Sequence, residues 1–279
     1  VRGEKIPGGP IGALPEPSDC PPVPINLAPP IDETDSMALM RSSYEVTTMT
    51  PIANFTPDKW RQMRWGYYQL IERSDREIGK VLTALKKAEL KENTLVIFTA
   101  DHGDCTGAHS FAQKTVFYDE SARIPLILSF PGTVAPGTSR KLVNVGIDIF
   151  PTMLDYAGLK IPGAFKGRSL KSVCENPITT DWRNYIVLSN NMVQGAVPPG
   201  ESEVPICRGR MVRTDSFKYA VYDLGSHRES LVDMERDPYE MQNLAKDPSY
   251  SKILNRHREM LRTYAGGTGD SEALEILGM

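Results

Sequence analysis

The chain has 279 residues, of which 40% are apolar and 24% are charged, and its formal net charge is −3. This composition is typical of globular proteins and suffices for one large α/β domain or for a domain with a smaller companion. The small negative charge gives no electrostatic reason to expect nucleic acid or an anionic membrane as a partner, and no apolar run approaches the ~20 residues of a membrane-spanning helix.

The first residue and the cysteines limit what the sequence says about cellular location and metal binding. The chain begins with Val1 rather than Met, which indicates a processed or truncated product, so the missing leader says nothing about where the whole protein resides. Its four cysteines are widely spaced and form no C-x-x-C pair, which argues against a structural zinc site. The sequence leaves one or two disulfides as an undecided alternative, because it cannot show which thiols pair.

Residues 1–56 are rich in proline, with nine prolines in the first thirty positions. Proline fixes φ and lacks an N–H, so this segment favours an extended coil lying over a surface rather than a helix or a central strand. It shows no apolar pattern that would build a core of its own. We therefore expect a tail or a connecting segment here, not a separate domain.

A long helix and a strand are predicted next. Thr56, Pro57 and Asp58 supply an N-cap, a proline at the first helical position and an early acid. Apolar residues then recur on one helical face for about thirty residues. Residues 94–100 follow as an apolar run without alternation, which is typical of a strand buried on both faces inside a parallel sheet.

Beyond this strand the same alternation of elements continues. Residues 123–130 predict a second apolar strand, residues 141–145 a short strand, and residues 148–158 a helix that ends at Gly158. This order of elements predicts an α/β fold over residues 57–175, with a mixed, largely parallel sheet between helices.

The pattern changes after about residue 175. Short strands linked by tight turns, followed by one helix, predict a small antiparallel α+β subdomain over residues 176–279. The predicted strands are 185–189, 208–214, 217–222 and 230–234, and the helix covers about 249–264.

Ionisable side chains gather directly after the strand at 94–100. In open α/β sheets, ligands bind beyond the carboxyl ends of the strands, so this cluster is the predicted site. The open alternative is that its aspartates cap a loop while its histidines face solvent. The members of the cluster are Asp101, His102, Asp104, His109 and Lys114.

The residue types in this cluster suit a divalent cation beside an anion. The Asp101 carboxylate is a hard oxygen donor for calcium or magnesium, and the His102 imidazole can bind or orient a ligand. Lys114 would neutralise charge on sulfate or phosphate oxygens opposite the cation. Because calcium takes about six to eight oxygens, the other ligands must come from elsewhere.

A longer series of motifs runs in order from about residue 60 to the end of the chain. It comprises the segments 93–104, 107–109, 120–127, 148–152, 167–170, 210–213 and 237–240, together with Lys114. In type and order these motifs resemble the second half of the type I sulfatases, which belong to the alkaline-phosphatase-like superfamily. The iduronate, choline and bacterial glycan sulfatases look most similar.

This resemblance implies an alkaline-phosphatase-like fold and sulfuric ester hydrolase activity on a sulfated sugar or a similar sulfate ester. It implies that Asp101 and His102 contact a metal ion, calcium rather than magnesium. By the same resemblance, Lys114 would hold the sulfate oxygens, and His109 would lie near the substrate or the leaving group. The resemblance also favours a periplasmic, extracellular or lysosomal location.

One motif of that family is missing. Sulfatases use a formylglycine made from the Cys or Ser of a C/S-x-P-x-R motif in the N-terminal half, beside an aspartate pair that completes the calcium site. Cys20 is followed by a proline two positions later, but Pro24 stands at the arginine position, so we interpret Cys20 as a decoy. The resemblance thus implies a partner, the N-terminal half of the same protein, and an inactive isolated chain.

Two other hypotheses stay open. A phosphodiesterase or phosphonate hydrolase of the same superfamily would share the Asp–His metal end and differ in the nucleophile and the metal, neither of which is visible here. A truncated chain could also persist as a non-catalytic binding module. The outer motifs are interpreted as local structure, with Asp148 as an N-cap, Gly158 as a helix stop and Glu240 as part of a turn or cap.

Overall fold

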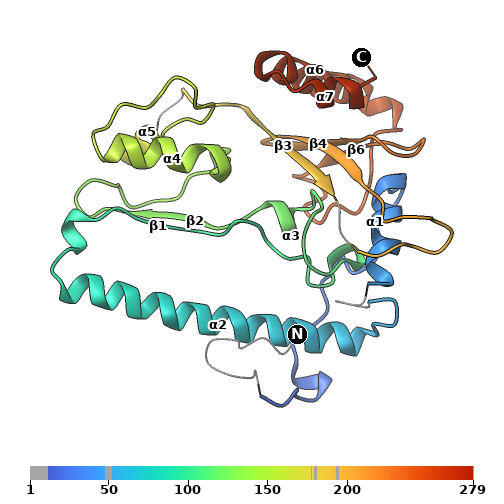
Figure 1. Cartoon of the computed structure of the whole chain (residues 1–279), viewed down its shortest axis with the longest axis horizontal. Helices are drawn as coiled ribbons and strands as arrows, with labels where there is room; N and C mark the ends of the chain where they lie inside the picture. Colours follow the sequence, from blue (N-terminus) through green and yellow to red (C-terminus); the bar gives the residue numbers. More distant parts are fainter. Residues whose placement is uncertain (1–11, 48–51, 177, 179–180, 193–194, 279) are drawn as a thin grey trace.

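The computed structural model describes residues 12–278 except 48–51, 177, 179–180 and 193–194. Within these residues, no helix is both long and apolar enough to cross a bilayer. The regular elements fall into two groups, one around a pair of strands and one around a four-stranded sheet (Figure 1). Short 3₁₀ turns lie at Pro17–Asp19, Lys91–Asn93, Ala108–Ser110 and Pro248–Tyr250.

The first group places two antiparallel strands between helices (Figure 1). Strands β1 (Val96–Thr99) and β2 (Leu126–Ser129) pair in register from Val96 opposite Ser129 to Thr99 opposite Leu126. Helix α2 (Pro57–Lys87) runs along one side of this pair, while α4 (Val145–Tyr156) and α5 (Lys171–Glu175) lie on the other side. The predicted long helix and both predicted strands are therefore confirmed.

Strand β1 is not buried on both faces, contrary to the expectation from its apolar sequence. Phe98 is 39% exposed and Ile127, on β2, is 58% exposed. The facing helix does not cover them, since Val81 on α2 is itself 68% exposed. Every ladder between the described strands is antiparallel, so the predicted parallel neighbours of β1 are not found among the described residues. The apolar strand thus requires cover that these residues do not provide.

The second group is the predicted antiparallel subdomain, which the structure confirms. Its sheet has the order β3-β4-β5-β6, and helices α6 and α7 pack on one face, where Leu231 and Leu261 are fully buried. The elements are β3 (Tyr185–Met192), β4 (Cys207–Thr214), β5 (Phe217–Tyr222), β6 (Glu229–Asp233), α6 (Ser251–Thr268) and α7 (Ser271–Ile276).

The opposite face of this sheet packs against helix α1 (Asp35–Glu45) and the loop after β1. This helix corrects the expectation of an extended coil throughout residues 1–56. No proline occurs from residue 31 to 50, and Met37, Met40 and Tyr44 follow helical spacing. All three are buried in the core beside Phe111, so burial of one helical face stabilises α1.

Helix α4 begins earlier than predicted, and the predicted strand at 141–145 is absent. Asn144 is the N-cap, because its Oδ1 accepts a hydrogen bond from Gly146 N at 3.1 Å. Asp148 is therefore not the N-cap; it is fully buried in α4 and receives two hydrogen bonds of 2.7 Å from the Arg183 guanidinium. Gly158 stops the helix as predicted, with φ at +70°.

Candidate active site

The loop after β1 folds back on itself and is tied at its base by Asp104. One oxygen of this carboxylate accepts hydrogen bonds from the backbone N–H groups of Thr106 (2.8 Å) and Gln113 (3.2 Å). The N–H of Cys105 donates to the carbonyl of Gln113 at 2.7 Å. Burial raises the pKa of the Asp104 carboxyl group. These bonds return the chain to the end of β1, which brings Lys114 beside His102.

Asp101, His102 and Lys114 meet at this position, as predicted. The Lys114 ammonium donates a hydrogen bond to Nε2 of His102 at 2.7 Å. A carboxylate oxygen of Asp101 lies 3.3 Å from the same nitrogen. The Asp101 side chain is 85% exposed and that of His102 is 37% exposed, so this cluster faces the outside of the described structure.

The tautomer of His102 is set by its own backbone neighbour. Nδ1 lies 2.7 Å from the carbonyl oxygen of Gly103, and a carbonyl can only accept, so Nδ1 carries the proton. Because an ammonium can only donate, Nε2 is the acceptor of the hydrogen bond from Lys114. Histidine ligands of metals are held in the same way, with the second ring nitrogen donating to a carbonyl or a carboxylate.

The backbone beside His102 is held by the short helix α3 (Asp119–Ala122). The N–H of Gly103 donates to the carbonyl of Ser121 at 2.8 Å. A Cβ atom added at Gly103 would lie 1.9 Å from the backbone oxygen of Glu120. Only glycine allows this close approach, so α3 and the His102 loop are packed backbone to backbone.

Gly103→Ala is expected to destabilise the chain by about 3 kcal/mol, because a backbone oxygen cannot move aside as a side chain can. Chemical denaturation of both forms gives this difference. Gly79→Ala is the matched control, since a Cβ at Gly79 on α2 meets nothing within 4 Å and alanine favours the helix. Equal stabilities for Gly103→Ala and the parent chain would contradict the close packing.

His109 does not join the other three predicted site residues. Its side chain is 0% exposed, and its ring stacks on Tyr118 with the ring centroids 3.7 Å apart. The amide of Asn26 donates to His109 Nε2 at 3.1 Å, so this imidazole is neutral. The alternative of a solvent-facing histidine is therefore wrong for His109. Its role near the substrate or leaving group stays a prediction.

The buried state of His109 predicts a pH dependence of stability. Burial, with smaller effects from Lys218 and Arg41, lowers the pKa of His109 from 6.5 to about 3. Below pH 6.5 the unfolded chain binds a proton that the folded chain refuses until about pH 3. As the pH is lowered from 6.5 toward 3, the free energy of unfolding should therefore decrease, by up to about 1.4 kcal/mol per pH unit from this group.

Urea unfolding from pH 7 down to pH 5 measures this dependence. The His109→Gln variant should lose that part of the slope, because glutamine does not titrate, whatever its absolute stability. Parallel stability curves for the two proteins would show that His109 is protonated in the folded chain.

Several supporting residues were not predicted. The Tyr44 hydroxyl on α1 donates to the Lys114 carbonyl at 2.9 Å, and the Asn190 amide on β3 donates to the Thr115 carbonyl at 2.9 Å. Tyr44 and Asn190 bind backbone carbonyls, which every residue type carries, so no pattern of residue types in the sequence predicts these contacts. Residue 44 was expected in extended coil, although the helical spacing of its apolar neighbours could have indicated α1.

Among the described residues, neither Cys20 nor a third possible metal ligand joins the cluster of Asp101, His102 and Lys114. Cys20 is buried, and its thiol donates to the carbonyl of Glu16 at 3.5 Å, away from the contacts of Lys114. All four cysteines are free thiols. Within the described part of the chain, no three or more His, Cys, Asp or Glu side chains are grouped so that they could hold a metal ion.

Two family models match the chain. The model described as sulfatase matches residues 38–159, which include the loop after β1. The model described as N-sulphoglucosamine sulphohydrolase, C-terminal, matches residues 107–265, which is more than half of the chain. Together they cover the cluster, the packing of α3 and the four-stranded sheet.

Characterised relatives carry related names. The chain is 33% identical over 219 residues to a Delta 4,5-hexuronate-2-O-sulfatase of Bacteroides thetaiotaomicron, which covers 77% of this chain and 44% of that protein. It is 31% identical over 228 residues to arylsulfatase K of Canis lupus familiaris, covering 79% and 41%. The chain thus spans less than half the length of these relatives.

Solved structures share the architecture. A 2-O GAG sulfatase is similar with a TM-score of 0.76 and 30% identity, over 94% of this chain and 54% of that one. A phosphonate monoester hydrolase of Agrobacterium radiobacter shares the fold, with a TM-score of 0.75 and 24% identity over 90% and 52%. These likenesses confirm the predicted alkaline-phosphatase-like α/β fold, and with the two family models they show that the chain belongs to the type I sulfatase family and corresponds to its C-terminal portion.

Proposed function

We propose that the protein containing this chain is a calcium-dependent sulfuric ester hydrolase that acts on a sulfated sugar or a similar sulfate ester. The observation that carries the proposal is the Lys114 ammonium 2.7 Å from the bare Nε2 of His102, in a chain of the sulfatase family. Relatives named for sulfated hexuronate and for sulfated N-acetylglucosamine support the class of substrate.

The residues present fit a calcium ion. Asp101 offers an exposed carboxylate, and His102 offers a ring nitrogen whose lone pair already receives a cationic partner. Calcium bound there would draw charge from the sulfate oxygens. Two side chains do not fill a calcium shell, so the proposal needs further oxygen ligands from an N-terminal portion.

Lys114 is the group of this chain that would hold the sulfate. Its ammonium has three N–H donors, and the one now directed at Nε2 of His102 would be released when calcium takes that lone pair, so all three could reach sulfate oxygens. A charge-assisted hydrogen bond of this kind strengthens as negative charge builds on the transferred group. The hydrogen bond from Nδ1 to Gly103 would then keep Nε2 of His102 directed at the metal, with Lys114 beside it.

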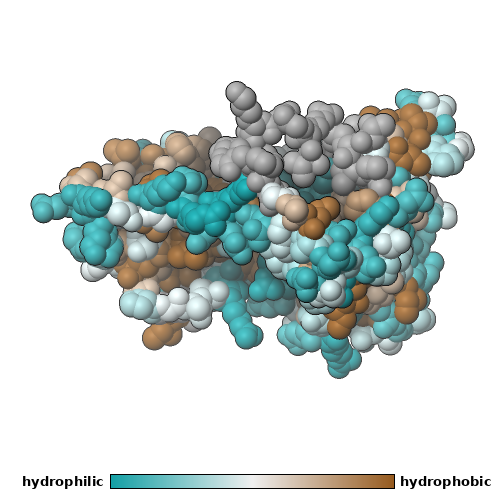
Figure 2. Space-filling view, turned by 90° about the horizontal axis from the view of Figure 1, so that it is seen from below, coloured by the Kyte–Doolittle hydropathy of each residue, from teal (hydrophilic) through white to brown (hydrophobic). Residues whose placement is uncertain are grey.

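The same proposal assigns the nucleophile to the N-terminal half of the protein, as a formylglycine. Apolar residues around β1, β2, α2 and α4 are exposed, and Figure 2 shows recessed hydrophobic areas in the left half of the molecule. Such surfaces are usually covered by a partner. The exposed side chains include Val81, Leu82, Phe98, Ile127, Phe150 and Met153. A periplasmic, extracellular or lysosomal location completes the proposal.

The test uses the whole protein that contains this chain, with matched aryl sulfate and aryl phosphate esters as substrates. Faster hydrolysis of the sulfate, together with an upstream C/S-x-P-x-R motif, is the expected result. Preference for the phosphate would instead favour the phosphodiesterase or phosphonate hydrolase, whose fold is shared. Hydrolysis of neither ester would leave the non-catalytic module as the better description.

A further inference from the structure

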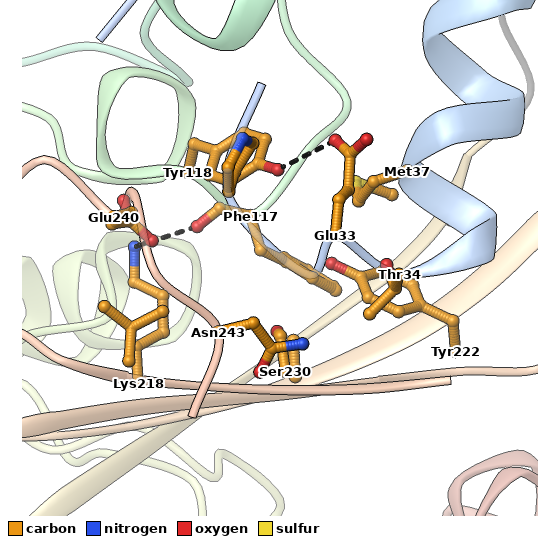
Figure 3. Close-up of a pocket in the computed structure, with 13 residues that line it drawn as sticks. Glu33, Thr34, Met37, Phe117, Tyr118, Lys218, Tyr222, Ser230, Glu240 and Asn243 are labelled. Atoms are coloured by element: carbon orange, nitrogen blue, oxygen red, sulfur yellow. Dashed lines mark hydrogen bonds and ion pairs between the residues drawn. The ribbon is translucent and has the colours of Figure 1, made fainter. Parts of the chain in front are cut away.

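A buried ion cluster joins the four-stranded sheet to the segment that follows Lys114. Lys218, on β5, has a side chain that is only 4% exposed. Its ammonium donates to the carbonyl of Phe117 at 3.0 Å and to the Asp119 carboxylate, and it lies 2.8 Å from Glu240 Oε1. All three N–H donors are thereby used. Figure 3 shows the Lys218 ammonium beside the Glu240 carboxylate, with a dashed line to the carbonyl oxygen of Phe117.

Glu240 holds the same segment through its other oxygen. Oε2 of this carboxylate accepts a hydrogen bond of 2.6 Å from the N–H of Asp119, the first residue of α3. Glu240 is 3% exposed and has a φ of +56°, in a turn where its N–H donates to the carbonyl of Asp237. The residue interpreted from sequence as local turn or cap chemistry therefore caps a helix from a distant part of the chain.

The backbone held by these two residues lies on both sides of the Lys114–His102 contact. Phe117 comes three positions after Lys114. Helix α3, which starts at Asp119, meets the residue after His102 through the bond from Gly103 N to Ser121 O. Moving the 117–119 backbone would therefore shift the lysine and the histidine relative to each other.

Stability alone does not account for this cluster. Taking an ammonium and two carboxylates out of water costs about as much as their attraction returns, and apolar side chains of similar size often pack as well. Burial raises the pKa of Glu240, although Lys218 acts in the opposite direction. Unlike apolar packing, the Lys218 ammonium forms directional bonds to three specific groups, which are the carbonyl of Phe117 and the carboxylates of Asp119 and Glu240.

We infer that Lys218 and Glu240 are positioning residues that hold Lys114 against His102 by fixing the backbone at 117–119 to the C-terminal sheet. The Lys114–His102 contact lies within this chain, whereas the effect of that contact on turnover rests on the proposed function. Both residues act through the backbone of α3 and the segment before it, so neither needs to touch a substrate.

The experiment uses the whole protein with the double variant Lys218→Met/Glu240→Met, which replaces the ion pair by apolar side chains that can pack. In the calcium-free protein, where Lys114 keeps its bond to His102, the rate at which an amine-reactive acylating reagent modifies Lys114 is measured by mass spectrometry, relative to exposed Lys80 on α2. The ratio should rise about threefold or more, because a lysine side chain released from His102 is more open to the reagent. The melting temperature is recorded for each protein.

Turnover gives the second readout. If the parent protein hydrolyses an aryl sulfate, kcat of the double variant should fall by about tenfold or more with KM little changed, since a misplaced catalytic group costs rate rather than binding. An unchanged labelling ratio overturns the inference, and so does a raised ratio with unchanged kcat. A parent protein without activity would refute the proposed function, and the labelling ratio would still decide the inference.

Arg210→Met is the matched control. Arg210 is an equally buried cation of the same sheet, paired with Asp270 at 2.8 Å and Glu272 at 2.6 Å beside α7. Loss of the Arg210 guanidinium should lower the melting temperature without changing the labelling rate of Lys114 relative to Lys80. If this labelling ratio rises as much as in the double variant, any weakening of the sheet releases Lys114, and the inference is overturned. If the double variant does not fold, Glu240→Gln decides by the same ratio, because it keeps the side-chain size and removes the charge facing Lys218.

Discussion

Replacing Lys114 by alanine is expected to lower kcat for sulfate ester hydrolysis by about a hundred- to a thousand-fold in the whole protein. The Lys114 ammonium lies 2.7 Å from Nε2 of His102, just after the end of β1. Its loss removes a hydrogen bond that strengthens as charge develops on the sulfate, so kcat should fall more than KM rises. Steady-state kinetics with an aryl sulfate measures the effect.

Lys80→Ala is the control for this variant. Lys80 is an exposed lysine of α2 that forms a surface ion pair with Glu77, so its removal should leave kcat unchanged. Melting temperatures of the two variants separate a local loss from general unfolding. If Lys114→Ala keeps the parental kcat, Lys114 is not part of the site.

Removing calcium by chelation is expected to reduce turnover by about a thousand-fold or more, and added calcium should restore it. Asp101→Asn should imitate chelation, because the amide keeps the shape of the side chain but loses the charge that a hard cation requires. Isothermal titration of the metal-free protein measures calcium uptake, and the variant should bind it more weakly. Magnesium should restore less activity, since it demands a smaller octahedral shell.

The matched control is Asp75→Asn, which removes an exposed carboxylate on α2. It should change neither the calcium affinity nor turnover. Full activity in the presence of chelator, or equal calcium binding by Asp101→Asn and the parent, would refute the proposed metal site.

Much of the fold follows from hydrophobic periodicity. The long helix α2, strands β1 to β6 and helix α6 were predicted within a few residues, because the helices carry a helical repeat and the strands are short apolar runs bounded by turns. Helix α1 was missed because the prolines before it dominate the composition of residues 1–56. The exposure of Phe98 could not be predicted, since an apolar pattern states what a strand requires and not whether neighbouring strands are present.

The site was predictable where it is local in sequence. Asp101, His102 and Lys114 lie within 14 positions and follow a strand, so residue type and position indicate their meeting. His109 shares their sequence neighbourhood, but its ring turns inward onto Tyr118. Lys218 and Glu240 contact this region across about a hundred residues, and bonds from their side chains to backbone atoms leave no spacing that a single sequence reveals.

The β1–β2 pair has a consequence for the behaviour of the chain in solution. Among the described strands each of the two pairs only with the other, over four registered positions, so each also presents an outer edge of free peptide groups. Exposed apolar edges recruit strands from other molecules, and an isolated two-stranded ribbon is only marginally stable. Copies of the separated chain would thus associate through the same edges that lead into Asp101, and the lifetime of the monomer would shorten as the protein concentration rises.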